Sequence, residues 1–192
     1  MPTLIIISAT SGAGKTLQFE NLQSHYGPGQ VTTITSRTQG IGEGDTAYHF
    51  LSDEQITKME LRGETIWVTG RYSNRYSITE QAIWQSIQNN QGLAFVAITP
   101  DYHVCLANWC IRNGITPINI HLVAPELEEQ KRRLLQRGRE EFDPKRIQAN
   151  AQFELDAQAA AKQLKLHFIE QGTPEEMFEQ LRELIDSIHD PS

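Results

Sequence analysis

The sequence predicts an α/β fold built on a central parallel sheet. Short apolar, β-rich runs alternate along the chain with segments of helical spacing, as in parallel strands joined by helices. The run at residues 93–98 is apolar throughout, which is expected of a strand buried on both faces of a sheet. No internal repeat, linker or low-complexity segment interrupts this pattern, so we expect one domain.

The expected strands are short apolar or β-branched runs bounded by turn residues. The first leads into a glycine-rich loop, and Gly92 separates the run at 93–98 from the helix before it. In chain order, the expected strands are residues 3–8, 31–34, 65–69, 93–98, 116–123 and 166–169.

The expected helices have apolar residues at helical spacing and recognisable ends. Gly114 is a C-cap signal, and Asp143-Pro144 opens a helix with Asp as the N-cap and Pro at the first helical position. Thr173-Pro174 opens the last helix. The expected helices span residues 15–26, 52–61, 79–90, 101–113 and 125–137, and two more begin at 143 and 173.

Composition excludes several classes of protein. The 192 residues include 24 acidic and 17 basic ones, a net charge of −7, which argues against a nucleic-acid partner. No apolar run approaches the roughly 20 residues of a membrane span, so we expect no membrane partner and a cytoplasmic location. Cys105 and Cys110 lack the spacing of a disulfide framework or a zinc site, and we predict two buried thiols in one helix. The six histidines likewise show no metal-ligand spacing.

Residues 9–16 read A-T-S-G-A-G-K-T and match the Walker A pattern, with Ala9 in place of the usual first glycine. Glycines let backbone N–H groups wrap a phosphate, and the following helix presents its positive N-terminus to it. Because the motif lies between an expected strand and an expected helix, it predicts an ATP site with Mg²⁺. Lys15 would reach the β- and γ-phosphates, and Thr16 would join the metal's ligands. The expected ATP-binding residues are Ser11, Gly12, Ala13, Gly14, Lys15 and Thr16.

Four further segments that act as motifs follow the phosphate loop along the chain. They read T-S-R-T-Q-G-I-G-E at 35–43, Y-H-F-L-S at 48–52, G-R-Y-S-N-R-Y at 70–76 and R-L-L-Q-R-G at 133–138, the last followed by Arg146 and Glu154. Each segment is a weak signal alone, but their joint order and spacing cover most of the chain. The sequence therefore resembles a divergent member of the guanylate kinase family, which are P-loop nucleoside monophosphate kinases.

This resemblance implies a P-loop NTPase three-layer fold with a central parallel sheet, a small inserted substrate-binding subdomain and a lid. It implies a single domain over residues 1–192, with a core of about 1–34 and 79–192, an insertion of about 35–78 and a lid of about 137–146. The implied reaction moves the γ-phosphoryl group of ATP to a nucleoside monophosphate, with GMP as the first expectation.

The resemblance also implies an acceptor site. Arg37, Tyr48 and Tyr76 match the residues that hold the phosphate of the monophosphate substrate, since guanidinium and phenol groups donate to phosphate oxygens. Thr33 offers a hydroxyl near the base, and Glu43 belongs to the same substrate-binding segment.

The implied catalytic residues are Lys15 and two lid arginines. Arg137 and Arg146 match the arginines that swing over the transferring phosphoryl group and offset its developing charge. The alternative interpretation of both arginines is a solvated basic helix.

Several positions depart from the family pattern. Gly40 stands where the family has its second clamping arginine, and Arg71 and Arg75 are the candidates to replace its charge. The guanine-reading glutamate falls at Trp67, or at Ile66 with one insertion, and we interpret Trp67 as a core residue.

Two more departures concern the base and the metal. Ile78 replaces a small hydroxyl residue, and the strand at 93–98 lacks the family's aspartates, with Asp101 as the nearest substitute. We therefore expect a largely retained phosphate clamp beside a degraded guanine-reading site.

Two other functions stay open. One is a related P-loop kinase such as ribose 1,5-bisphosphate phosphokinase, a family that often ends its lid helix in R-G-R-E, as residues 137–140 do here. The other is a non-catalytic guanylate kinase-like binding module, against which the intact Lys15 and Thr16 argue. In every case the partner is a small phosphorylated molecule or group.

Overall fold

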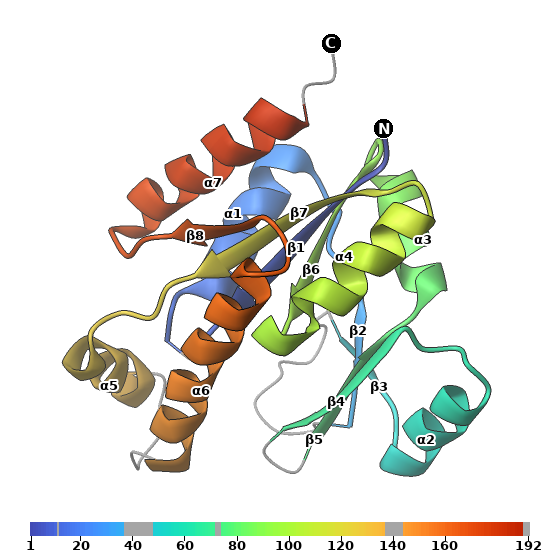
Figure 1. Cartoon of the computed structure of the whole chain (residues 1–192), viewed down its shortest axis with the longest axis horizontal. Coiled ribbons are helices and arrows are strands. Elements are labelled where there is room, and N and C mark those ends of the chain that lie inside the picture. The colour runs from blue at the N-terminus through green and yellow to red at the C-terminus, as the bar shows by residue number, and fades with distance from the viewer. Residues whose placement is uncertain (11, 37–47, 72–73, 137–143, 190–192) are drawn as a thin grey trace.

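The computed structural model describes residues 1–10, 12–36, 48–71, 74–136 and 144–189, and it has the predicted α/β architecture (Figure 1). Four parallel strands form the core sheet in the order β6-β1-β7-β8. They are β1 (Thr3–Ala9), β6 (Leu93–Ile98), β7 (Thr116–Leu122) and β8 (Leu166–Ile169).

Helices cover both faces of the core sheet and complete three layers (Figure 1). Along β1, Ile5 and Ile7 pack on one face, whereas Leu4 and Ile6 pack on the other, and all four side chains are fully buried. This explains why the run is apolar at every position rather than at alternate ones. The first face is covered by α1 (Lys15–Tyr26) and α7 (Pro174–Ile188), and the second by α3 (Glu80–Asn89), α4 (His103–Arg112) and α6 (Pro144–Ala161).

A second, smaller sheet has the strand order β3-β2-β5-β4 (Figure 1). Its strands β2 and β3 are parallel, and β5 is antiparallel to both β2 and β4. The helix beside it starts at a capping box formed by Ser52 and Gln55. The elements are β2 (Thr33–Thr35), β3 (Tyr48–Phe50), α2 (Asp53–Leu61), β4 (Trp67–Arg71) and β5 (Asn74–Ile78).

The chain joins the two sheets just before β2. Val31 N donates to Phe95 O, and Phe95 N donates to Gly29 O, both at 2.8 Å, so this segment runs along the free edge of β6. A Cβ atom at Gly29 would lie 2.7 Å from Leu93 O and 2.9 Å from the Phe95 ring. Only glycine therefore permits so close an approach of the two backbones.

Most predicted elements are confirmed, with two strands missed and one helix divided. The helix at 15–26 and the strands at 93–98 and 166–169 have the predicted bounds. The missed strands, β3 and β5, lack a continuous aliphatic run and are held by their neighbours in the small sheet. The expected helix at 101–113 consists of a short 3₁₀ turn, η1 (Pro100–Tyr102), followed by α4. The remaining helix is α5 (Leu127–Gln136).

One expectation about the cysteines is wrong. Both lie in α4 as predicted, but Cys110 is buried whereas Cys105 is exposed. Residues five apart on a helix point about 140° away from each other, so one apolar face cannot cover both. Burial raises the pKa of the Cys110 thiol to about 12. Separately, no helix within the described ranges is long and apolar enough to cross a membrane.

Candidate active site

The phosphate loop leaves the end of β1 and enters α1 directly. Ala9 is the last residue of β1, where the backbone is extended, so alanine is acceptable in place of the usual first glycine. Gly12 and Gly14 have φ of 90° and 88°, in the left-handed region that favours glycine. The N-cap residue Gly14 has no side chain to cap α1, which is expected of a helix whose first-turn N–H groups bind an anion.

The two functional side chains of the motif begin α1. Lys15 is its first residue and half-buried, and Thr16 is its second and exposed. The geometry of the loop thus agrees with the prediction of a phosphate site, while the roles of Lys15 and Thr16 stay predictions.

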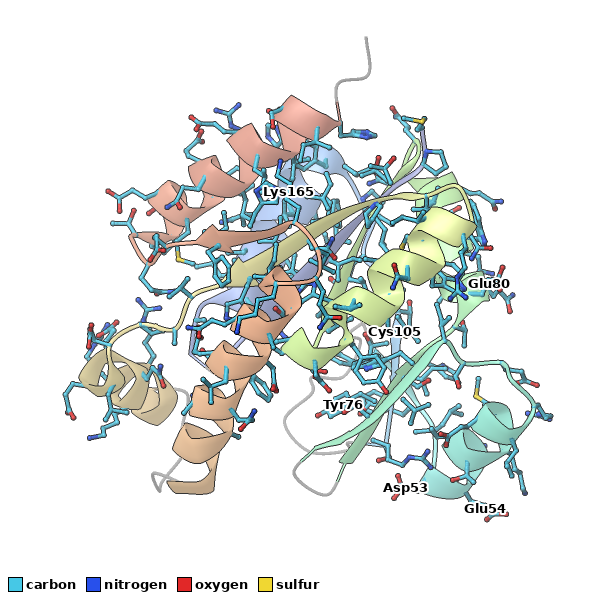
Figure 2. The ribbon with its side chains drawn as sticks, viewed as in Figure 1. Asp53, Glu54, Tyr76, Glu80, Cys105 and Lys165 are labelled. Atoms are coloured by element: carbon cyan, nitrogen blue, oxygen red, sulfur yellow. The ribbon has the colours of Figure 1, made fainter. Side chains whose placement is uncertain are left out.

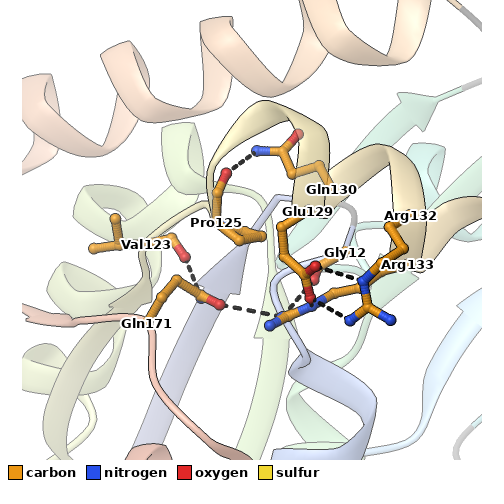
Figure 3. Close-up of polar contacts among 8 residues, drawn as sticks. All are labelled: Gly12, Val123, Pro125, Glu129, Gln130, Arg132, Arg133 and Gln171. Atoms are coloured by element: carbon orange, nitrogen blue, oxygen red, sulfur yellow. Dashed lines mark hydrogen bonds and ion pairs between the residues drawn. The ribbon is translucent and has the colours of Figure 1, made fainter.

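A further cation contacts this loop from α5. Arg133 Nη1 donates to Gly12 O and to Gln171 Oε1, each at 3.1 Å, and Gln171 in turn donates to Val123 O (Figure 3). The Arg133 Nε atom lies 2.6 Å from Glu129 Oε1. Arg133 opens the segment at 133–138 that resembles the guanylate kinase lid, but the sequence predicts no separate role for it.

Glu129 orients the arginines of α5. Its two oxygens accept hydrogen bonds from Arg132 and Arg133, and these contacts lower the pKa of the Glu129 carboxyl to about 2. Glu129 is therefore ionised at neutral pH, and both guanidinium groups are held by it (Figure 3).

The predicted acceptor residues that the structure describes share one face of the small sheet. Thr33 pairs with Tyr48 across β2 and β3, and Thr35 pairs with Tyr76 across β2 and β5. Directly paired residues, and residues two apart on a strand, lie on the same face. The side chains of Thr33, Tyr48 and Tyr76 therefore lie on the same side of the small sheet.

This common face is turned toward the core, and α2 lies on the other side. Tyr76 packs against the apolar cluster that contains Trp67 and Tyr102. Figure 2 shows Tyr76 on the small sheet, with Asp53 and Glu54 at the start of α2, away from the core sheet.

Arg75 does not replace the charge missing at Gly40. Its guanidinium donates to Asp53 O at 3.1 Å, to the Thr57 hydroxyl, and to Glu60 Oε2 at 2.7 Å, all on α2. Adjacent residues of a strand point to opposite faces, so Arg75 faces α2 because Tyr76 faces the core. The side chain of Arg71 lies outside the described part of the structure.

The position expected for the guanine-reading carboxylate is filled by apolar side chains. Trp67 and Ile78 lie opposite each other in the β4–β5 pair and are 4% and 0% exposed. The Trp67 ring contacts the Tyr102 ring edge-on, with centroids 5.4 Å apart. The interpretation of Trp67 as a core residue is thus confirmed.

The nearby acids are exposed. Glu64 pairs with Arg62 at 2.8 Å on the surface. Asp101 accepts from the Thr99 hydroxyl at the end of β6. Several predicted site residues lie outside the described residues, namely Ser11, Arg37, Glu43 and Arg137, as does the side chain of Arg146.

Comparison with known proteins places this chain in a family. The family model for guanylate kinase matches residues 1–188. The chain is 32% identical to a guanylate kinase of Chlamydia felis over 173 residues, which cover 86% of this chain and 78% of that protein. It is 29% identical to one from Ruegeria pomeroyi over 143 residues, covering 71% of this chain and 64% of the relative.

The fold comparison agrees. The crystal structure of guanylate kinase from Anaplasma phagocytophilum matches with a TM-score of 0.62 at 18% identity, over 99% of this chain and 96% of that one. The predicted P-loop NTPase fold is thereby confirmed. The chain belongs to the guanylate kinase family.

Proposed function

We propose that this chain transfers the γ-phosphoryl group of ATP to GMP and reads the guanine base weakly. The family is that of ATP-dependent nucleoside monophosphate kinases, so the class of reaction follows from family membership. Two features of this chain together support the proposal. A phosphate loop follows the end of β1, and hydroxyl-bearing side chains share one face of the small sheet.

The donor half of the site binds the ATP phosphates. Backbone N–H groups at the start of α1 receive phosphate oxygens, and the helix dipole favours their negative charge. Lys15 adds a cation at the β- and γ-phosphates. Arg133, which touches the Gly12 carbonyl oxygen, brings a second positive charge to the same loop.

The acceptor half binds a phosphomonoester. Tyr48 and Tyr76 donate phenol hydroxyls from one face of the small sheet, and Arg37 is proposed to add the guanidinium that a phosphate requires. Thr33 offers a single hydroxyl to the base. Glu43 is proposed as part of the same segment.

The donor set fits Mg²⁺. Thr16 supplies an exposed hydroxyl beside Lys15, and hard oxygen ligands of this type, completed by phosphate oxygens and water, are what Mg²⁺ prefers. In the described ranges no three His, Cys, Asp or Glu side chains gather as a metal site, which fits a metal held mainly by the nucleotide. When bound, Mg²⁺ offsets charge on the β- and γ-oxygens.

The lid residues Arg137 and Arg146 are proposed to offset charge on the transferring group. Arg146 belongs to α6, which lies on the same side of the core sheet as α4. A cytoplasmic location is proposed with the function, since ATP and nucleoside monophosphates are its substrates.

The test is ATP consumption with Mg²⁺, screened against GMP, dGMP, AMP, UMP, CMP and ribose 1,5-bisphosphate. We expect turnover with GMP and a measurable rate with at least one other nucleoside monophosphate. Turnover with ribose 1,5-bisphosphate alone would instead favour the sugar-phosphate kinase, and ATP binding without turnover would favour a binding module.

A further inference from the structure

Polar side chains form a hydrogen-bonded chain through the core where β1 ends. Ser8 Oγ lies 2.8 Å from both His121 Nδ1 and His103 Nε2. His103 Nδ1 lies 3.3 Å from Asn119 Oδ1, and His121 Nε2 lies 3.2 Å from Glu154 Oε1. Ser8, His103 and His121 have no exposed surface, so the chain belongs to the interior rather than to a solvated cleft.

From His121 through Ser8 and His103 to Asn119, each residue of this hydrogen-bonded chain donates to the next. Burial lowers the pKa of His103 to about 4, so its ring is neutral at pH 7. Its Nδ1–H donates to Asn119 Oδ1, so its Nε2 accepts from the Ser8 hydroxyl. The Ser8 oxygen in turn accepts from His121 Nδ1–H. A hydrogen bond between His121 Nε2 and Glu154 Oε1 then requires one proton between them, which leaves the pair with no net charge.

Packing alone does not explain these residues. Placing polar groups in a core is unfavourable unless each one is paired, and an apolar set of similar volume stabilises a core at least as well. A fully paired buried network does, however, fix one arrangement of the elements that carry it. The question is therefore which elements it holds in place.

The Glu154 end of the chain holds the two helices that flank residues 137–143. Glu154 is on α6, and its Oε1 also accepts from Ala124 N at 3.2 Å, in the connection that leads to α5. Asn150 Nδ2 donates to Gln130 Oε1 at 3.0 Å and joins α6 to α5 a second time. Both of these side chains are buried.

The Ser8 end holds the phosphate loop. Ser8 is the residue before Ala9, the last of β1, and it pairs with His121 across β1 and β7. One carboxylate oxygen of Glu154 thus links α6, the entry to α5, and the strand that leads into the loop. Arg146 lies eight residues before Glu154, roughly 12 Å along the helix axis.

We propose that Glu154 is a positioning residue for phosphoryl transfer, which holds α6 in register with the strand that leads into the phosphate loop. The proposal rests on the proposed function. Glu154 contacts His121 and Ala124, and its effect is on where α6 presents its N-terminal end relative to the phosphate loop. Loss of the Glu154 hydrogen bonds lets α6 shift. A misplacement of about 1 Å in a catalytic group can cost on the order of 100-fold in rate.

The test compares Glu154→Gln with Asp156→Asn in the full chain. Glutamine keeps the shape and an oxygen for Ala124 N but replaces the carboxyl group opposite His121 with a neutral amide. Asp156 is on the same helix, and its carboxylate accepts from Gln152 Nε2 at 2.8 Å, outside the chain of hydrogen bonds. The measurements are kcat and KM with GMP, the Kd of ATP by calorimetry, and the Tm.

We expect Glu154→Gln to lower kcat by about 10- to 100-fold, with the Kd of ATP within about twofold of wild type, and Asp156→Asn to change neither. A lower Tm with unchanged kcat would show a purely structural residue and overturn the proposal. Equal losses in ATP binding and kcat would also overturn it, because Glu154 would then support the ATP site and not the placement of α6.

Ser8→Ala breaks the same chain at its other end and keeps the proposal falsifiable if Glu154→Gln does not fold. It should also lower kcat with little change in the Kd of ATP, and the double variant should lose less than the product of the two single effects. Unchanged kcat in Ser8→Ala would overturn the proposal. A wild-type protein with no turnover on any acceptor would instead overturn the proposed function, and the positioning role of Glu154 with it.

Discussion

The guanidinium of Arg133 donates to the carbonyl oxygen of Gly12 across 3.1 Å, which joins α5 to the loop expected to hold ATP. The same nitrogen donates to Gln171 Oε1, and Nε is held by Glu129. A planar fork is needed to reach all three partners at once, and a lysine ammonium, as a point charge, cannot do this.

Arg133→Lys should therefore lower kcat by about tenfold or more while keeping the net charge. Arg132→Lys is the matched control, because Arg132 contacts Glu129 and makes no contact with the part of the loop that the structure describes. Steady-state kinetics with saturating ATP and GMP measure both. Equal losses in the two variants would mean that the contact to Gly12 has no part in turnover.

Lys15→Ala should abolish phosphoryl transfer and weaken ATP binding, because the cation at the β- and γ-phosphates is lost. Calorimetric titration with ATP measures the binding, and a nucleotide-free Tm checks that α1 is intact. Lys58→Ala, which removes an exposed cation paired with Glu54 on α2, is the control. Unchanged ATP binding in Lys15→Ala would rule out the phosphate-loop assignment.

Stability should fall as the pH drops below 6.5, in part through His103. Burial is the largest cause of its lowered pKa, and nearby His121 lowers it further, while the Asn119 hydrogen bond and Asp101 act in the opposite direction. With a folded pKa of about 4 and an ordinary value of 6.5, the unfolded chain binds more protons between these limits. The stabilisation is complete above pH 6.5, and roughly 3 kcal/mol of it is lost by pH 4.

Urea unfolding at pH 7 and at pH 4.5 measures this loss. His103→Gln cannot titrate, so its free energy of unfolding should fall less between the two pH values than that of wild type, even though it starts lower. An identical fall in both proteins would place the acid sensitivity in other groups.

The core sheet and the phosphate loop could be predicted from the sequence because local signals determine them. The run at 93–98 is apolar throughout, and residues 9–16 carry a motif whose glycines and lysine have a direct physical use. The helix at 15–26 could be predicted from the spacing of its apolar residues and from the glycine-rich loop before it.

The small sheet and the polar chain could not be predicted in this way. β5 carries Arg75 and Tyr76 on opposite faces, and only pairing with β2 and β4 shows which of them faces the core. Ser8, His103, His121 and Glu154 come from four separate elements, so their contact depends on tertiary structure alone. No spacing in the sequence indicates it.

The last prediction concerns base selectivity. Trp67 and Ile78 are buried against Tyr102, and neither offers an acceptor to the guanine N1–H and amino groups. The ratio of kcat/KM for GMP to that for AMP should therefore lie below about 10³ in wild type, since strong discrimination needs paired polar groups. Trp67→Glu is a poor test, because losing the indole costs about 3–5 kcal/mol and buries an unpaired carboxylate.

Ile66→Glu is the better test, because Ile66 is only half-buried and is the other position that aligns with the guanine reader. It should raise the GMP to AMP ratio, whereas Ile66→Gln, which has the same shape without the charge, should raise it less, since a carboxylate accepts more strongly from N–H groups. Competition kinetics with both monophosphates in one reaction measure the ratio directly. A wild-type preference for GMP of about 10³ or more would contradict weak guanine reading. Another residue would then have to accept from the base, and Glu64→Gln and Asp101→Asn would be the first variants to measure, because Glu64 lies just before β4 and Asp101 just after β6.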